Sequence, residues 1–280
     1  MRHKRKGRFA NIPEGQTSPL ESAVHSRDGT TMDMVKEAIE HKQVRLAYQP
    51  VVSAKDTKKP AFYEGLIRVL DETGRVIPAK DFMGAVAHTD LGRQLDCLAL
   101  ELGLHTLGTQ PTIRLSINMS GRSIGYSRWM NSFRRGLKRW PDIADRLILE
   151  ISESSVNELP EIVADFMDDL QLQGVSFALD DYGAGKTSFR VFKDFYFDIL
   201  KLDGQFTKNI HTDSENQIIA KSIAFLGNQF DIYTVAGRVE TPKDAEVLRD
   251  LGFDCLQGFL FGSPSVTPPW KEKKKNKSAA

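Results

Sequence analysis

Strand-length and helix-length segments alternate along most of this 280-residue chain, and this alternation constrains its fold more than any other feature. Several segments have the apolar, β-prone composition of strands, and they cover residues 45–52, 61–70, 113–117, 147–151, 175–179, 199–202, 232–236 and 254–257. Helical periodicity separates most of them, over 79–107, 129–139, 159–172, 188–195, 215–229 and 242–251. Strands that alternate with helices in one continuous chain favour an α/β fold on a mostly parallel sheet.

The first two strands depart from this pattern because only residues 53–60 separate them. A loop of this length cannot hold a crossover helix, so the two strands are expected to pair antiparallel. Eight strands with an antiparallel first strand are best explained by a single (β/α)8 TIM-type barrel. A doubly wound open sheet is the alternative, but no GxGxxG motif follows the first strand.

Composition divides the chain into a barrel domain and two basic ends. Residues 1–30 are rich in Gly, Pro, Ser and charge and are expected to form a disordered basic leader. Thr31 precedes an apolar stripe of helical period that reaches about His41, so the barrel domain is placed at 31–266. Residues 267–280 form a basic C-terminal tail. Both ends are expected to be solvated, and neither has the interleaved aromatic residues of a nucleic-acid interface, so no nucleic-acid partner is expected.

The cysteine count and the hydropathy pattern indicate the cytoplasm. Cys97 and Cys255 lie far apart in apolar contexts, which fits a reducing compartment and offers neither a disulfide framework nor a CxxC site. No apolar segment is long enough to span a membrane, and the basic N-terminus lacks the apolar core of a signal peptide.

Polar residues stand where most of the predicted strands end. In a TIM-type barrel the active site lies at the carboxyl ends of the strands, so these side chains should gather at one face. The set consists of Asn118, Glu150, Asp180, Asp181, Lys201, Asp203, Glu240 and Gln257, with Glu64 from the second strand. Taken singly, each could belong to a turn, a cap or a solvent-facing strand position. As a ring, oxygen ligands without His or Cys select hard cations such as Mg²⁺, Mn²⁺ or Ca²⁺, and one lysine among them fits phosphoryl chemistry.

The chain from about Asp33 to Pro264 resembles the EAL domain of bacteria, whose active members hydrolyse cyclic di-GMP to linear pGpG. Its motifs agree with the family in type, order and spacing. They are Gln49-Pro50, EGLIR at 64–68 for the family's EALLR, INMS at 117–120, EISE at 150–153, DDYGAG at 180–185 for DDFGTG, KLD at 201–203 and QGF at 257–259.

The resemblance implies roles for these residues. Metal ligands would be Glu64, Asn118, Glu150 and Asp180, with Asp181 serving a second metal, and the ions would be Mg²⁺ or Mn²⁺. Lys201 would orient or activate the attacking water, Glu153 would hold the Asp181 loop, and Glu240 would be the surviving second glutamate of its motif. Gln49, Arg68 and Gln257 would contact the dinucleotide.

One motif departs from the family. Where the family reads AEGVET, this chain reads AGRVET at 236–241, so Gly237 replaces a glutamate of the water-activating end and Arg238 follows it. Losing a general base typically costs a factor of about 10² to 10⁴ in rate. Two hypotheses follow: a slow cyclic di-GMP phosphodiesterase, or an inactive EAL domain that acts as a cyclic di-GMP receptor or protein-interaction regulator. A homodimer and a regulatory protein partner are neither shown nor excluded by the sequence.

Overall fold

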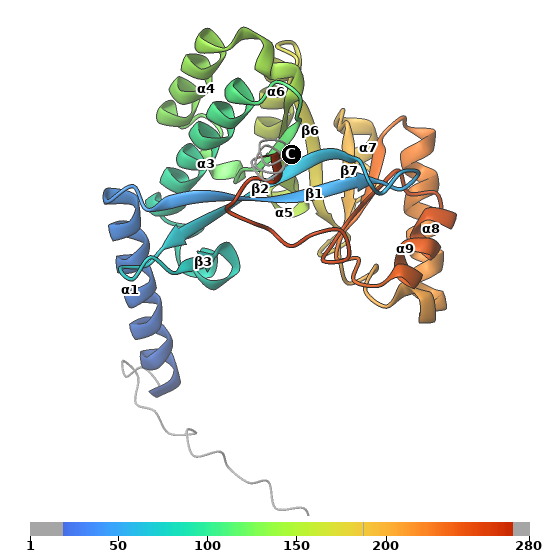
Figure 1. The fold of residues 1–280 in the computed structure, drawn as a ribbon, viewed down its shortest axis with the longest axis horizontal. Coiled ribbons are helices and arrows are strands. Elements are labelled where there is room, and N and C mark those ends of the chain that lie inside the picture. Colours follow the sequence, from blue (N-terminus) through green and yellow to red (C-terminus); the bar gives the residue numbers. More distant parts are fainter. Residues whose placement is uncertain (1–18, 187, 271–280) are drawn as a thin grey trace, which may run out of the picture.

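The computed structural model describes residues 19–186 and 188–270. Within them, one mixed sheet has the strand order β1-β9-β8-β7-β6-β5-β4-β2-β3, and β1 also pairs with β2, which closes a barrel of eight strands with β3 outside it (Figure 1). The strands are β1 (Val44–Ser53), β2 (Pro60–Leu70), β3 (Val76–Pro78), β4 (Leu115–Asn118), β5 (Leu147–Ser152), β6 (Ser176–Tyr182), β7 (Ile199–Leu202), β8 (Tyr233–Ala236) and β9 (Cys255–Gln257). The predicted TIM-type barrel is confirmed.

Strand β1 is antiparallel to both of its barrel neighbours, β2 and β9. The remaining neighbours, from β2 through β4 round to β9, are parallel. The short 53–60 connection leaves no room for a crossover helix, so β1 and β2 form a hairpin. The predicted antiparallel first strand is therefore confirmed.

Helices cover the outside of the barrel (Figure 1). They are α1 (Pro19–Glu40), α2 (Met83–Val86), α3 (Asp90–Thr109), α4 (Ser127–Arg139), α5 (Glu153–Glu158), α6 (Pro160–Gln171), α7 (Val191–Asp194), α8 (Ser214–Gln229) and α9 (Pro242–Asp250). Their apolar faces and the outer face of the barrel form the main core, which contains Trp129, Phe133, Phe166 and Phe177. None of the described helices is long and apolar enough to cross a membrane.

Helix α1 begins at Pro19, twelve residues before the predicted start near Thr31. The described part of the expected disordered leader is therefore helical, and residues 1–18 lie outside the described range. Proline is well suited to the first turn of a helix, where its missing N–H has no partner to lose. The glycine, serine and charged residues of this segment favour disorder by composition, and one proline at a possible helix start is too weak a signal to indicate a helix. The second half of α1 buries Val35 and Ala38 in a cluster with β1 and β2.

The helix predicted over 79–107 is two helices with a 3₁₀ turn, η1 (Ala79–Asp81), before them. Thr89 ends the first part and caps the second, since its side chain accepts a hydrogen bond from the Leu91 N–H. Gly92 allows the two parts to meet closely, because a Cβ there would lie 2.7 Å from the Val86 carbonyl oxygen. The helix predicted over 188–195 is also shorter, since α7 is a single turn that packs Phe192 against Tyr182.

The segment expected to begin a free C-terminal tail is attached to the barrel as far as the structure describes it. Ser265 pairs with Tyr48 through two backbone hydrogen bonds. Trp270 packs edge-on against Tyr48 and Tyr63, with ring centroids 4.8 and 5.3 Å apart. These two aromatic rings give Trp270 an apolar binding place on the barrel. The basic composition of residues 267–280 does not indicate such an attachment. Residues 271–280 of the predicted tail lie outside the described range.

Candidate functional site

The candidate site is one layer of inward-facing side chains inside the barrel. Below it lies an apolar layer, a separate cluster formed by Val51, Phe62, Ile148, Ala178, Ile199, Val235 and Cys255. Side chains in a strand alternate between faces, so the residue two positions further toward the carboxyl end also points inward. In the parallel strands and β2 this second layer consists of Glu64, Asn118, Glu150, Asp180, Lys201 and Gln257, and the antiparallel β1 contributes Gln49. Strand β8 places Gly237 at the equivalent position after Val235.

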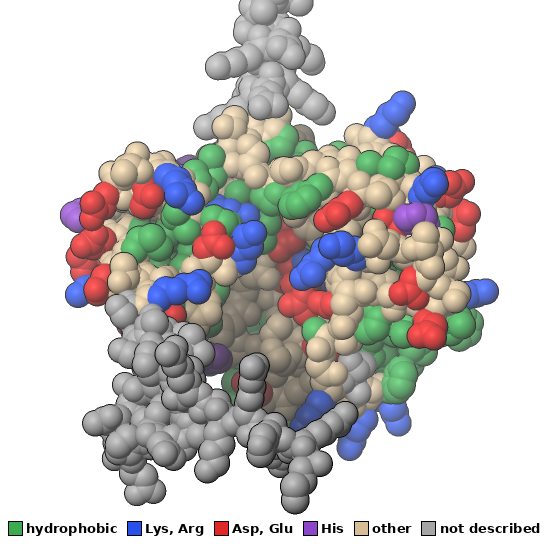
Figure 2. Space-filling model, turned by 90° about the horizontal axis from the view of Figure 1, so that it is seen from below, with side chains coloured by type: hydrophobic (Ala, Val, Ile, Leu, Met, Phe, Trp, Pro, Cys, Tyr) green, Lys and Arg blue, Asp and Glu red, His purple; other side chains and the backbone are tan. Residues whose placement is uncertain are grey.

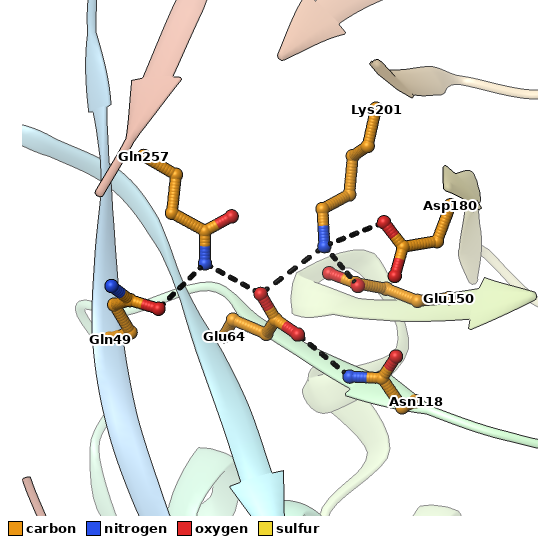
Figure 3. Close-up of polar contacts among 7 residues, drawn as sticks. All are labelled: Gln49, Glu64, Asn118, Glu150, Asp180, Lys201 and Gln257. Carbon is orange, nitrogen blue, oxygen red and sulfur yellow. Dashed lines mark hydrogen bonds and ion pairs between the residues drawn. The ribbon is translucent and has the colours of Figure 1, made fainter. Parts of the chain in front are cut away.

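Lys201 lies at the centre of this layer (Figure 3). Its Nζ is 3.2 Å from Glu64 Oε2, 2.5 Å from Glu150 Oε2 and 3.1 Å from Asp180 Oδ1. The lysine and both glutamates are almost completely buried, and Asp180 is half-buried. Three carboxylates from three strands therefore converge on a single ammonium group.

Amide side chains complete the polar layer around Glu64 (Figure 3). Asn118 Nδ2 donates a hydrogen bond to Glu64 Oε1 at 2.8 Å. Gln257 Nε2 donates to Glu64 Oε2 at 2.6 Å and to Gln49 Oε1 at 3.2 Å. Gln49 in turn donates to the Gly262 carbonyl at 3.1 Å, which connects the layer to the loop after β9. Each amide is thus held in a fixed orientation by a partner from another strand.

Burial and neighbouring charges both shift the pKa values of these groups. Burial alone would lower the pKa of Lys201, but the charges of Asp180, Glu150 and Glu64 raise it well above its usual value. Burial, followed by the charge of Glu64, raises the pKa of Glu150 to about 8. Burial would also raise the pKa of Glu64, but Lys201 and the hydrogen bonds from Gln257 and Asn118 lower it. The acidic groups exceed the single cation, so the layer favours an additional positive charge.

The donor set fits a hard divalent cation. Glu150 Oε1 is buried and has no hydrogen-bond partner, although it belongs to a carboxylate next to Lys201. A buried carboxylate oxygen without a partner is costly, and a cation would satisfy it. Among residues 19–186 and 188–270, no three acidic, histidine or cysteine side chains form a ready-made metal cage, because the carboxylates turn to the ammonium group instead. A metal ion would therefore compete with Lys201 for oxygen ligands.

Near the end of β6, where its pairing with β7 is irregular, Asp181 lies in the left-handed backbone region, with φ of 54°. Glu153 is buried at the start of α5, and its Oε2 accepts a hydrogen bond from the Gly183 N–H at 3.2 Å. The predicted contact of Glu153 with this loop is thus present. Asp181 itself is exposed, and in the described part of the chain it forms no ion pair with Lys201, in contrast to its neighbour Asp180.

Arg68 and Glu240 are two further predicted site residues, and no hydrogen bond or ion pair within the described part of the chain joins either of them to the cluster. Arg68 is buried, and its Nη1 donates to the carbonyl of Ile67 at 2.8 Å, while burial lowers the pKa of its guanidinium. Glu240 is exposed, one residue before Thr241, which caps α9. The structure therefore brings together seven of the predicted residues, connects Glu153 to the turn that follows Asp181, and leaves Arg68 and Glu240 at the edge.

Asp96 supports the site and was not predicted from the sequence. This buried α3 residue accepts hydrogen bonds from the Ser120 N–H at 3.0 Å and from Ser123 Oγ at 2.6 Å. Those serines lie two and five residues after Asn118, so Asp96 fixes the exit of β4. An aspartate between Leu95 and Cys97, within an apolar helical stripe, is the sequence signal that could have indicated it.

The surface around the hollow of the molecule carries both charge signs. Figure 2 shows a face hollowed in its middle, with acidic and basic side chains along both sides of the hollow. This mixture agrees with the net charge of +1 for the whole chain. On this face the charges do not form a continuous basic surface.

A closed barrel with a lysine-centred acidic layer at the carboxyl ends of its strands defines the class: a TIM-type barrel with the polar site at its usual end. The sequence model of the EAL domain matches residues 32–264. The chain therefore belongs to the EAL domain family.

Individual relatives agree with this assignment. The cyclic di-GMP phosphodiesterase PdeF of Escherichia coli is 29% identical over 240 residues, which cover 83% of this chain and 31% of that protein. The chain spans about a third of the length of the curated relatives it matches. The solved PaMucR phosphodiesterase in complex with c-di-GMP is 27% identical, with a TM-score of 0.78 over 87% of this chain and 99% of that one. A manganese and cyclic di-GMP complex of Klebsiella pneumoniae BlrP1 is 25% identical, with a TM-score of 0.70 over 80% of this chain and 56% of that one.

Proposed function

We propose that this domain binds cyclic di-GMP together with Mg²⁺ or Mn²⁺ and hydrolyses it slowly to pGpG. The observation that carries the proposal is the inward layer in which Lys201 meets Glu64, Glu150 and Asp180. The names of the relatives, phosphodiesterases and their cyclic di-GMP complexes, give the ligand that this layer would serve.

In this proposal, the chain's own residues would bind the divalent ion, orient the phosphodiester and carry the positive charge of the lysine. Glu64, Asn118, Glu150 and Asp180 supply the oxygen atoms that would hold the divalent ion, with Glu150 Oε1 ready to accept it. When bound, such an ion supplies a positive charge against a phosphodiester and lowers the pKa of a water molecule. With its carboxylate partners engaged in holding such an ion, the Lys201 ammonium would donate a hydrogen bond to a phosphate oxygen or to the attacking water.

Other predicted residues would position the ligand and the loop. Gln49 and Gln257 form a connected pair of amides beside Glu64, suited to hydrogen bonds with the dinucleotide. Arg68 offers a planar set of donors for phosphate or guanine at the edge of the layer. Glu153 holds the loop of Asp181 through the Gly183 N–H.

A specific observation favours a second candidate, a cyclic di-GMP receptor without turnover. Gly237 occupies the β8 position of the inward layer and contributes no side chain there. A general base at this position would account for a factor of about 10² to 10⁴ in rate. The four proposed ligands of the first metal ion are unaffected by this residue, so binding would suffer less than catalysis.

A paired measurement separates the candidates. Calorimetry in Mn²⁺ with cyclic di-GMP gives the affinity, and chromatography of pGpG over several hours gives turnover. Slow pGpG release in wild-type protein that stops in Glu64→Gln supports the enzyme. Binding without product supports the receptor, and absence of both binding and product would refute the proposed ligand.

A further inference from the structure

Two neighbouring helices on the outside of the barrel carry opposite charges. Helix α4 has five exposed cations and no acid, whereas α6 has four exposed acids and no cation. The two helices meet through their buried sides, where Trp129 of α4 packs edge-on against Phe166 of α6 with ring centroids 5.6 Å apart. The cations are Arg128, Arg134, Arg135, Lys138 and Arg139, and the acids are Glu161, Asp165, Asp168 and Asp169. The barrel surface therefore has a basic strip beside an acidic strip.

Little of this charge is neutralised within the chain. Arg135 pairs with Glu101 of α3 at 3.3 Å, in an exposed contact. Among residues 19–186 and 188–270, no ion pair within 4 Å joins α4 to α6, and none of the four acids of α6 has a basic partner at that distance. Opposite charges that lie on adjacent helices but do not pair are available to charges from outside the molecule.

The surface between the two helices is mainly apolar. Because Arg135 reaches α3, the opposite flank of α4, with Met130 and Leu137, faces α6. The buried positions of both helices have the same spacing and both helices lead into parallel strands, so the flank of α6 that faces α4 carries Ile162 and Asp169. Met130 and Leu137 are half-buried, and Ile162 is 49% exposed. A partly exposed apolar strip thus lies between the basic and the acidic strip.

A surface with basic, apolar and acidic strips in this order is complementary to itself. A twofold axis that runs in the surface, between the helices and parallel to them, places α4 of one copy over α6 of the other and the two apolar strips together. We propose that a second copy of this chain binds here, so that the domain forms a twofold dimer through α4 and α6. Leu172, which follows α6 and is 89% exposed, would be covered in the same contact. This interaction surface lies outside the barrel and goes beyond the proposed function.

Sedimentation velocity of the full chain, without metal ion or dinucleotide, tests this proposal. Wild-type protein should dimerise, and raising the salt concentration from about 0.05 to 0.5 M should weaken the dimer, because salt screens exposed charges. One variant, Arg134→Glu with Lys138→Glu, reverses the charges farthest from the buried side of α4. The other, Asp165→Lys with Asp168→Lys, does the same for α6. Each variant alone should dimerise at least about tenfold more weakly, since the twofold axis makes every changed contact occur twice.

An equimolar mixture of the two variants should form a heterodimer, because the reversed charges of one chain then face the opposite charges of the other. This recovery would also show that both variants are folded. Lys221→Glu with Lys243→Glu is the control, since it changes the net charge equally on exposed positions of α8 and α9 and should leave the dimer intact. A monomeric wild-type chain, a dimer that persists in both reversed variants, or a mixture that stays monomeric would overturn the proposal. Each of these results would leave the proposed function untouched, because no ligand is present.

Discussion

Lys201 is the residue on which the charges of the inward layer depend. Replacing it with methionine keeps most of the unbranched side chain but leaves Glu64, Glu150 and Asp180 without their shared cation. Removing one partner of a buried ion pair typically costs about 3–5 kcal/mol. Urea denaturation of metal-free Lys201→Met should show a loss of this order, and millimolar Mn²⁺ should restore part of it. The exposed Lys208→Met is the control, and an equal loss in both variants would contradict this prediction.

Gly237 is the residue at which activity should be recoverable. A Cβ at this position would meet only the Leu202 carbonyl oxygen, at 3.9 Å, so a glutamate can be accommodated toward the inward layer. Gly237→Glu combined with Arg238→Gly should raise pGpG release by a factor of about 10² or more, the usual contribution of a general base. The rate is measured in Mn²⁺ at saturating cyclic di-GMP. An unchanged rate, with binding retained, would show that this loop does not limit catalysis.

Single residues of the site were predictable where strand alternation decides the direction of a side chain. Glu150, Asp180, Lys201 and Gln257 each lie within the last three residues of a short strand, so period-two alternation and the barrel assignment were sufficient to bring them together. Arg68 and Glu240 lie in the same motifs but at the edge of the layer. Their positions depend on loop and rotamer geometry that no spacing rule specifies.

Among the elements, α3 has a role in the site through Asp96. Burial raises the pKa of Asp96 to about 6, above the value near 4 expected in the unfolded chain. The native state therefore binds the Asp96 proton more tightly than the unfolded chain does. As the pH rises from about 4 to 6, this proton is lost, and the free energy of unfolding should fall by about 2–3 kcal/mol. Asp96→Asn keeps an acceptor for the Ser120 N–H and Ser123 Oγ and removes the titration. Urea unfolding at several pH values should show that this fall is lost.

Asp96→Ala is the matching variant for the hydrogen bonds themselves. It leaves a buried N–H and a buried hydroxyl without their acceptor, which typically costs about 1–3 kcal/mol for each group. This loss should persist at every pH, in contrast to the effect of the asparagine. Equal pH profiles for wild-type protein and Asp96→Asn would show that the carboxyl does not titrate in this range.

Helices and strands were predicted best where short apolar strand segments alternate regularly with helical segments. Strands β4 to β9 all begin within two residues of the apolar segments that indicated them, and only β6 ends further away, three residues beyond its segment, because burial on both faces gives a continuous apolar run. Strand β3 has only three residues, Val76–Pro78, and α5 only six, so neither builds a period that can be recognised. The division between α2 and α3 depends on Gly92 packing against the Val86 carbonyl, a tertiary contact that a helical stripe does not encode.

At the scale of the whole molecule, strand β1 of the barrel is held by a segment outside the region that matches the family. The match ends at residue 264, but Ser265 and Trp270 both attach to Tyr48 on β1. Tyr48 is buried, its hydroxyl is 2.8 Å from Thr106 Oγ1 on α3, and it precedes Gln49 of the inward layer. The C-terminal segment therefore stabilises the strand that joins β2 to β9 and supports one side of the site.

Truncation after Pro264 should consequently destabilise the barrel although it removes no residue of the family match. Trp270→Ala alone should cost about 2 kcal/mol, less than the 3–5 kcal/mol of a fully buried tryptophan, because Trp270 is half-buried. The truncated chain should lose more, since the two backbone hydrogen bonds between Tyr48 and Ser265 are removed as well. Urea denaturation measures both losses, with Val266→Ala as the control in the same segment. If the truncated chain unfolds at the wild-type urea concentration, closure of the barrel depends on β1, β2 and β9 alone.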